Sequence, residues 1–496
     1  MRSRLALAAI AVIAGSVSAQ STSSATAPKI AVRTWDAEGA PNAALTRGLV
    51  LELTHRLEMS PHLIVRAAAS GAKPEDVDYV LRLSAADVGS RVRLQWELQR
   101  ASSGTRLRGN NTRLEPNALA EQPGLIAGTV LGTLGQPNLS PTWRGAHASI
   151  ADRSAYREFV QILGQSGGED EQATLQGRIA ALEKLLPRLD AYPPAVASLG
   201  SDYVDLAGMV TGPATYYDRA AAALERAFAL DATYPPARAK LASLYAKIGN
   251  SERAVELLSE GLTQNSNYAP YHETLGYVLR YAGLMEQSID SYRQGQKLDA
   301  SLDNLVSTQD QITKSFIYLG DYDGALESHR RMRSVLERAN RSPDEKQWFY
   351  EGVIHLYRGD TTSAVAAFRA GARAVPNSVW TTFGRGYAAI AQGDMARAGA
   401  ILEELERQEI IDGERHYRLV HFAVFAGRTE RALHHLQVSA DGGFFNAPYI
   451  AQDPWLAPLR QLPRFAQILS AARTRQEAVR RRLAEGARRK PPAGQS

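Results

Sequence analysis

The chain has 496 residues, a formal net charge of +5 and no cysteine. The absence of cysteine excludes disulfides, thiolate metal sites, a cysteine nucleophile and a lipoprotein anchor. The length allows more than one domain, and a net charge this small on a chain of this size does not favour nucleic acid as a partner.

The first 19 residues have the pattern of a secretory signal peptide. Arg2 and Arg4 precede the apolar run Leu5–Ile13, and Val17–Ala19 ends in the small residues of a cleavage site. An uncleaved membrane anchor is the alternative, but the run is shorter than the roughly 20 residues that span a bilayer. We therefore expect cleavage, a mature chain that begins at Gln20, and a periplasmic or secreted protein.

Residues 29–135 have the alternating apolar and polar pattern of half-buried strands. We expect strands at Lys29–Trp35, His62–Ala67, Asp78–Ser84, Arg91–Arg100 and Thr105–Leu114, and helices at Ala43–Glu58 and Asn117–Leu134. The order β-α-β-β-β-β-α predicts a small α+β domain. Val77–Leu81, Arg91–Leu94 and the turn at Gly104 resemble the TolB amino-terminal-like domain, which often precedes helical repeats in bacterial envelope sensors.

Residues 151–440 contain a repeat in which a glycine is followed five residues later by a small residue. The pairs are Gly249/Ala254, Gly283/Ser288, Gly320/Ala325, Gly359/Ala364, Gly393/Ala398 and Gly427/Ala432. The steps between successive small residues are 34, 37, 39, 34 and 34 residues. Glycine permits a chain reversal between two helices, and the small residue allows the helices to approach closely. This period predicts an α-solenoid of helix pairs and resembles the tetratricopeptide repeat (TPR) family.

The resemblance implies that one stripe of the first helix in each unit lines a concave groove for a ligand. The residues of that stripe that we predict to bind a partner are Tyr277, Arg280, Tyr281, Lys314, Tyr318, Tyr357, Trp380, Phe383, Tyr387 and Tyr417. Large rings with a polar group are typical of peptide-binding hot spots. The alternative is that a tightly wound superhelix buries these rings against its own neighbours, and the sequence leaves both interpretations open.

Residues 441–487 are expected to form a helical cap and a basic tail. Phe465, Ile468, Leu469 and Ala472 make one apolar stripe that would cover the exposed end of the last unit. This tail resembles the carboxyl end of TolB-like/TPR proteins that are fused to cyclase, winged-helix or kinase domains. A signal peptide takes the place of such an effector domain here, so the resemblance does not extend to signalling or DNA binding.

The motifs that suggest catalysis do not have the required context. Gly164–Gly168 matches G-x-S-x-G, but helical spacing precedes it where a strand is needed. The adjacent His434 and His435 would point about 100° apart on a helix, which is unsuitable for one metal ion. We therefore expect no catalytic residue, no metal site and no cofactor.

Taken together, these features favour an exported, non-catalytic TPR scaffold that binds a protein or peptide in its concave groove. The alternative is a sensory subunit whose sheet domain binds a ligand and which works with a separate membrane effector. The sequence does not determine the oligomeric state.

Overall fold

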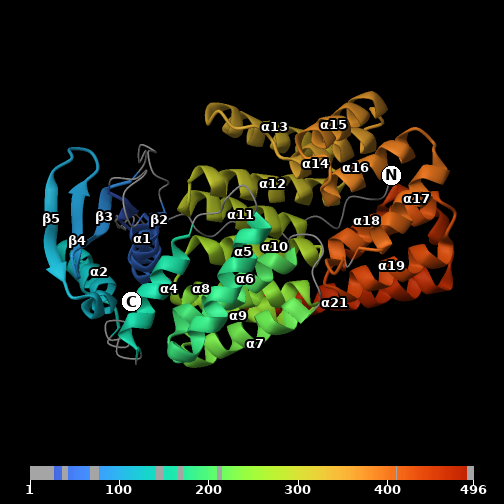
Figure 1. The fold of residues 1–496 in the computed structure, drawn as a ribbon. Helices are drawn as coiled ribbons and strands as arrows, with labels where there is room; N and C mark the ends of the chain where they lie inside the picture. The colour runs from blue at the N-terminus through green and yellow to red at the C-terminus, as the bar shows by residue number, and fades with distance from the viewer. Residues whose placement is uncertain are drawn as a thin grey trace, which may run out of the picture.

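The computed structural model describes residues 27–35, 43–67, 77–140, 150, 152–165, 171–208, 215–408 and 410–488. The predicted signal peptide lies outside these ranges. Figure 1 shows a small sheet domain at one end of the molecule and an array of helices that makes up the rest. This arrangement confirms the predicted fold class, a mainly α solenoid preceded by a small α+β domain.

The described part of the sheet domain has its strands and helices in the predicted order. Its elements are β1 (Lys29–Thr34), α1 (Ala43–Glu58), β2 (Ile64–Ala67), β3 (Tyr79–Val88), β4 (Arg91–Arg100), β5 (Arg106–Leu114), a 3-10 helix (Pro116–Glu121) and α2 (Gln122–Thr133). The sheet order is β2-β1-β3-β4-β5, with β1 parallel to β2 and β3, and with β3, β4 and β5 antiparallel. On α1, Leu45, Leu49 and Leu53 are buried because their spacing puts them on one face of the helix.

The helical array follows as a series of helix pairs. Its helices are α4 (Arg153–Leu163), α5 (Glu171–Leu185), α6 (Pro193–Gly208), α7 (Thr215–Leu230), α8 (Pro235–Lys247), α9 (Ser251–Gln264), α10 (Ala269–Tyr281), α11 (Met285–Leu298), α12 (Leu302–Leu319), α13 (Tyr322–Arg338), α14 (Glu345–Tyr357), α15 (Thr361–Ala374), α16 (Val379–Ala391), α17 (Met395–Glu406), α18 (Gly413–Phe425) and α19 (Thr429–Asp441). From α8 onward, the even-numbered helices are the first helix of each unit and the odd-numbered helices are the second.

The chain reverses at the register glycine of each regular unit. From Gly249 to Gly427, these glycines have φ between 70° and 83°, a left-handed conformation that is costly for any residue with a side chain. The small residues five positions later, from Ala254 to Ala432, are all completely buried. They lie where the second helix approaches the first, which is the role the sequence pattern predicts for them.

The residues after the array form α20 (Ala447–Gln452), a 3-10 helix (Pro454–Leu459) and α21 (Pro463–Arg488). In Figure 1, α21 lies between the last units and the early units of the array. Phe465, Ile468 and Ala472 of the predicted apolar stripe are buried, and Leu469 packs against the same core. The basic residues from Arg480 onward are mostly exposed where the structure describes them.

The array closes on itself through this carboxyl-terminal region. Arg475 donates from Nη2 to the carbonyl oxygen of Gly249 at 2.6 Å, and Gln476 donates from Nε2 to that of Gly283 at 2.9 Å. The amide of Phe445 donates to the carbonyl oxygen of Tyr281 at 3.1 Å. Besides lying against α19, as the predicted cap would, α21 therefore binds the turns of two early units.

The sheet domain is docked on the early helices by side chains that donate to backbone carbonyl oxygens. Asn265 Nδ2 donates to Glu58 at 2.7 Å, and Asn267 Nδ2 donates to Pro61 at 2.8 Å. Arg66 Nε donates to Leu298 at 3.2 Å. None of the described helices is both long enough and apolar enough to cross a bilayer.

Candidate functional site

The predicted partner-binding residues lie on the first helices of consecutive units. Tyr277, Arg280 and Tyr281 are on α10, Lys314 and Tyr318 on α12, Tyr357 on α14, Trp380, Phe383 and Tyr387 on α16, and Tyr417 on α18. Tyr277, Tyr357 and Trp380 are half-buried, and the others are at most 3% exposed. The structure therefore brings these residues to the inner face of the array but leaves most of them without access to solvent.

The space in front of this stripe is filled by residues Phe444–Trp455, which we call the inserted segment. The Phe444 ring lies 5.7 Å from the Tyr281 ring, 5.2 Å from the Tyr318 ring and 5.3 Å from the Tyr417 ring, measured between centroids. The Trp455 ring stacks on the Tyr357 ring at 4.6 Å. The inserted segment thus occupies the position in which a peptide ligand was expected.

Asp453 fixes the inserted segment to the inner face. Its Oδ2 accepts hydrogen bonds from the Tyr417 hydroxyl at 2.7 Å and from His421 Nε2 at 2.8 Å, and its side chain is fully buried. Burial raises the pKa of Asp453, but His421 and the converging hydrogen bonds lower it further, so the carboxyl group remains charged. A buried anion with this many donors is a specific anchor.

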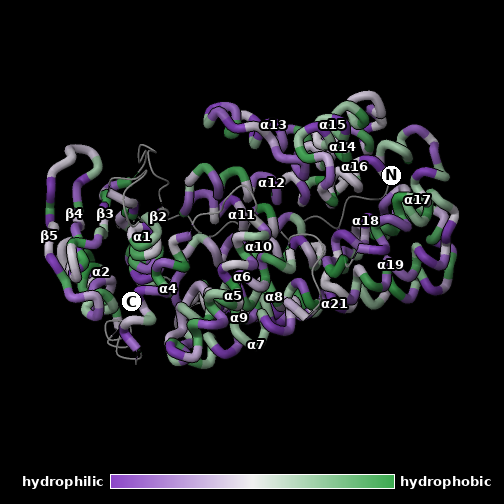
Figure 2. The backbone as a smooth tube through the Cα atoms, in the orientation of Figure 1, coloured by the Kyte–Doolittle hydropathy of each residue, from purple (hydrophilic) through white to green (hydrophobic). Residues whose placement is uncertain are grey.

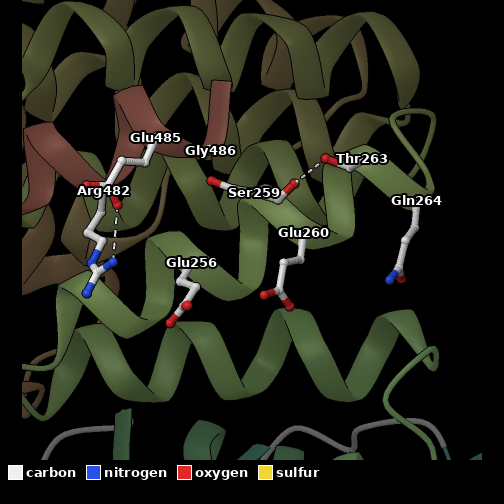
Figure 3. Close-up of a pocket in the computed structure, with 8 residues that line it drawn as sticks. All are labelled: Glu256, Ser259, Glu260, Thr263, Gln264, Arg482, Glu485 and Gly486. Carbon is white, nitrogen blue, oxygen red and sulfur yellow. Dashed lines mark hydrogen bonds and ion pairs between the residues drawn. The ribbon is translucent and has the colours of Figure 1, made fainter. Parts of the chain in front are cut away.

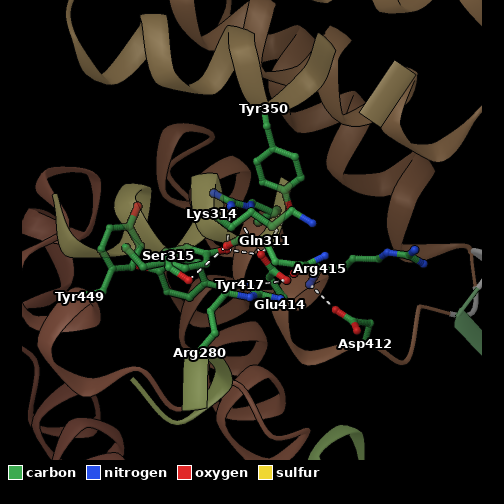
Figure 4. A network of polar contacts seen from close by, with 12 residues as sticks. Arg280, Gln311, Lys314, Ser315, Tyr350, Asp412, Glu414, Arg415, Tyr417 and Tyr449 are labelled. Atoms are coloured by element: carbon green, nitrogen blue, oxygen red, sulfur yellow. Dashed lines mark hydrogen bonds and ion pairs between the residues drawn. The ribbon is translucent and has the colours of Figure 1, made fainter. Parts of the chain in front are cut away.

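A second polar cluster lies behind the inserted segment (Figure 4). Glu414 Oε2 is 3.0 Å from Arg280 Nη1, and its Oε1 accepts hydrogen bonds from the hydroxyls of Tyr318 and of Tyr350. Lys314 pairs with Asp310 at 2.9 Å. Burial raises the pKa of Glu414, but the charges of Arg280, Lys314 and Arg418 outweigh burial and lower that pKa to about 2.

These contacts favour the self-packed interpretation of the stripe over the open groove, and partner binding by its residues stays a prediction. The stripe residues pack against each other and against the inserted segment, which is the alternative that the sequence left open. Most of their polar groups are tolerated inside because they find hydrogen-bond or ion-pair partners there, as the hydroxyls of Tyr281 and Tyr417 do. A partner cannot reach Tyr387 or Tyr417 unless the inserted segment leaves.

Open hollows lie elsewhere on the described surface. One of about 200 Å³ lies between α9 and α21 and is lined by Glu256, Glu260, Arg482 and Glu485, among others (Figure 3). Another of about 320 Å³ lies at the junction of the sheet domain and the array, where His62, Asn138 and Asn265 line it. Two further hollows, of about 430 and 410 Å³, adjoin each other beside α13.

The two hollows beside α13 share Arg333 and Glu337 in their linings, and we call them together the α13–α15 groove. It is lined by residues of α13, α14, α15 and the connection between α13 and α14. None of the predicted site residues lies in it. Two signals in the sequence point to this place: the repeat steps lengthen to 37 and 39 residues here, and α13 is rich in arginine. The family resemblance directs attention to the inner face alone, and for this reason the groove was not predicted.

The described residues contain no group of three or more His, Asp or Glu side chains that is placed to hold a metal ion. His434 is exposed, whereas His435 is buried and bonds Glu406 Oε1 at 2.9 Å. The two rings therefore lie in different environments, as expected for adjacent residues of a helix that do not share one metal ion. Of the G-x-S-x-G match, Ser166–Gly168 lies outside the described residues.

Comparison with known proteins relates the array to one family. The tetratricopeptide repeat family matches residues 216–276. No curated protein matches the chain. Similar solved structures include a TPR protein of Thermus thermophilus, with 19% identity and a TM-score of 0.33 over 40% of this chain and 98% of that chain. A TPR protein of Parabacteroides merdae has 14% identity and a TM-score of 0.36, over 57% and 98% of the two chains. Yeast Tom70 has 11% identity and a TM-score of 0.36, over 69% and 67%.

TM-scores below 0.5 do not establish a common overall architecture, so the assignment rests on the family match and on the repeat geometry. The matched residues run from α7 to α10 and include the register pair Gly249 and Ala254. The same left-handed glycine and buried small residue recur in every later unit up to Gly427 and Ala432. The helical part of this chain is therefore an array of helix pairs in the tetratricopeptide repeat register, and the family match itself lies at residues 216–276.

Proposed function

We propose that this protein is an exported, non-catalytic scaffold that binds a protein partner through the outer surface of its TPR array. The observation that carries the proposal is the contrast between the two faces of the array. The inner face is filled by the inserted segment, and the outer face carries an open groove beside α13. A large helical surface that is rigid and open on one side is suited to protein recognition.

Site-specific photocrosslinking in cells tests this function. A photoreactive residue is placed, one at a time, at exposed positions on different helices: Arg373 on α15, Glu430 on α19 and Arg481 on α21. We expect at least one position to give a discrete adduct with another protein, and the buried Phe383 to give none. If a folded protein gives no adduct at any exposed position, the scaffold function is wrong.

Export belongs to the same proposal and has its own test. The sequence pattern of the first 19 residues supports cleavage after Ala19. The intact mass of the native protein should then correspond to a chain that begins at Gln20 and is recovered from the periplasm. A mass that includes Met1, with sedimentation in the membrane fraction, would instead support an uncleaved anchor.

A sensory role for the sheet domain is the second candidate, and the hollow at the junction supports it. Ser60, His62, Asn138 and Asn265 give this hollow several hydrogen-bonding groups. The resemblance to TolB amino-terminal-like domains of envelope sensors is consistent with a ligand here. A small ligand that binds there should raise the melting temperature by mass action. If Asn138→Leu abolishes that rise, the ligand occupies the junction; an unchanged rise places it elsewhere.

A further inference from the structure

The α13–α15 groove has walls from three helices and a polar connection. The first hollow is lined by the end of α13, the connection through Arg341 and Pro343, Trp348 of α14, and the end of α15. The second hollow continues along α13 past His329 and reaches Glu351 and His355 of α14. Arg333 and Glu337 line both hollows. Figure 1 shows α13 at the edge of the molecule beside α14 and α15, and Figure 2 shows it as mostly hydrophilic.

The longer repeat unit explains why the groove opens here. α13 has 17 residues whereas α15 has 14, and the connection after α13 contains Asn340 in a left-handed conformation with φ of 53°. α14 then begins with a capping box between Asp344 and Gln347, which fixes the start of the helix. The extra length places Arg341 and Pro343 on the rim instead of bringing the next helix directly against α13.

Positive charge dominates the lining of the groove. Arg330, Arg333, Arg341 and Arg373 line it, against the carboxylates of Glu337 and Glu351. Glu351 is already paired with Arg333 at 2.9 Å and with His329 at 3.1 Å, and Arg341 is paired with Asp303 at 2.6 Å. Arg330 and Arg373 are exposed and have no ion-pair partner in the described parts of the chain. Their guanidinium groups are therefore available to a carboxylate from outside.

Trp348 supplies an apolar contact in the middle of this charge. Its ring is half-buried, and the guanidinium of Arg333 lies over it at 4.4 Å from the centroid. Ala370 and Ala374 of α15 add small apolar side chains to the same hollow. Because Glu351 and the Trp348 ring both hold Arg333, this guanidinium is ordered before any ligand arrives. A ring beside ordered arginines is a typical protein-binding hot spot.

We propose that the α13–α15 groove binds an acidic, extended peptide segment of the partner protein. Carboxylates of the segment pair with Arg330 and Arg373, and an apolar side chain between them lies on Trp348. This inference rests on the scaffold function and specifies the partner's chemistry. Nucleic acid fits less well, because Glu337 and Glu351 would repel a continuous phosphate backbone and the chain's net charge is only +5.

Fluorescence anisotropy on the full mature protein tests the groove. The probe is a fluorescein-labelled peptide of Asp and Glu with one central Phe. The comparison probes are the Asn and Gln version of the same peptide and a single-stranded oligonucleotide of equal length. We expect binding of the acidic peptide that weakens as salt is raised, and much weaker binding of the other two probes. Tighter binding of the oligonucleotide, or equal binding of the neutral peptide, would overturn the proposal.

Matched variants locate the binding site. Arg373→Glu and Arg330→Glu should each weaken binding about tenfold or more, because each replaces an attraction by a repulsion. Trp348→Ala should weaken binding without changing its salt dependence. Arg293→Glu on α11 makes the same charge change at an exposed position outside the groove, and it should leave affinity within about twofold. If Arg293→Glu and Arg373→Glu lose equal affinity for the acidic peptide, only the net charge of the protein matters, and the groove is not the binding site.

The two proposals fail in different ways. If photocrosslinks to a partner form at Glu430 or Arg481 but not at Arg373, the protein is a scaffold and the groove assignment is wrong. If no exposed position crosslinks to any protein, the scaffold function itself is wrong.

Discussion

Glu414→Gln should destabilise the protein strongly although it replaces only one oxygen of the side chain. Glu414 is the anion of the cluster behind the inserted segment, with Arg280 at 3.0 Å and Arg418 at 4.0 Å. Both arginines are 1% exposed, so water cannot replace the lost carboxylate. The substituted amide keeps the shape and one acceptor oxygen but leaves two guanidinium charges without their anion, and this imbalance determines the outcome.

The expected magnitude follows from the pKa of Glu414. Its ordinary value is 4.5 and the folded value is about 2. Since a tenfold change in acidity corresponds to about 1.4 kcal/mol, the charged form stabilises the fold by about 3 kcal/mol. This figure agrees with the roughly 3–5 kcal/mol that is lost when one partner of a buried ion pair is removed.

The sign of the pH dependence is also determined. Because folding lowers the pKa of Glu414, its stabilisation is complete above about pH 4.5 and disappears as the pH falls through about 2. The free energy of unfolding by urea, followed by tryptophan fluorescence, should therefore differ between wild type and Glu414→Gln at pH 7, with a gap that narrows below pH 4.5. Glu430→Gln is the control, since Glu430 is 83% exposed and its pair with Arg464 should contribute less than about 1 kcal/mol.

Two results would refute this reasoning. One is a decrease of less than about 1 kcal/mol in the free energy of unfolding of Glu414→Gln at pH 7, which would mean that water reaches the cluster. The other is a gap between the two proteins that does not narrow in acid. A further check is Arg280→Met in the Glu414→Gln background. Removing the unpaired cation should return part of the lost stability, whereas Arg280→Met alone should be destabilising.

Further predictions concern packing and turns. Phe465→Ala should lower the free energy of unfolding by about 3–5 kcal/mol because the ring is buried. Ending the chain at Leu483 should lower it by less than about 1 kcal/mol, because the residues removed are mostly exposed where the structure describes them. Calorimetry compares the two variants, and a larger loss in the shortened chain would show that the basic end is structural. Gly359→Ala should cost about 1–2 kcal/mol for its left-handed φ of 79° alone, since a methyl group there meets nothing within 4 Å. Gly283→Ala should lower the free energy of unfolding by urea more than Gly359→Ala does, because the methyl group would also lie 2.9 Å from Asn446 Oδ1. Equal decreases in the two variants would show that the contacts around Gly283 are loosely packed.

The repeat could be predicted because each of its positions has a local physical requirement. A residue at φ of 70° to 83° is nearly always glycine, and a residue at the closest approach of two helices must be small. The strands were predictable for a similar reason: on β4, Val92, Leu94, Trp96 and Leu98 alternate with polar residues and are buried. These requirements act over a few residues and so are visible in the sequence.

The filling of the inner face could not be predicted in the same way. The stripe from Tyr277 to Tyr417 was correctly placed on the first helices, but no periodic rule connects it to Phe444 or Asp453. Aromatic residues with hydroxyl groups serve equally well in an open groove and in a core with internal hydrogen bonds. Only the path of the chain after α19 decides between the two, and that path depends on contacts between residues far apart in sequence.

The closure of the array has a consequence for the order of events during synthesis. An open array of repeats can fold unit by unit as it leaves the ribosome, because each unit contacts only its neighbours. Here the carbonyl oxygen of Gly249 accepts its hydrogen bond from Arg475, 226 residues later in the chain. The carbonyl oxygen of Gly283 accepts its hydrogen bond from Gln476, 193 residues later. The early units therefore remain incomplete until almost the whole chain has been made, so the last helix to be synthesised completes the first units.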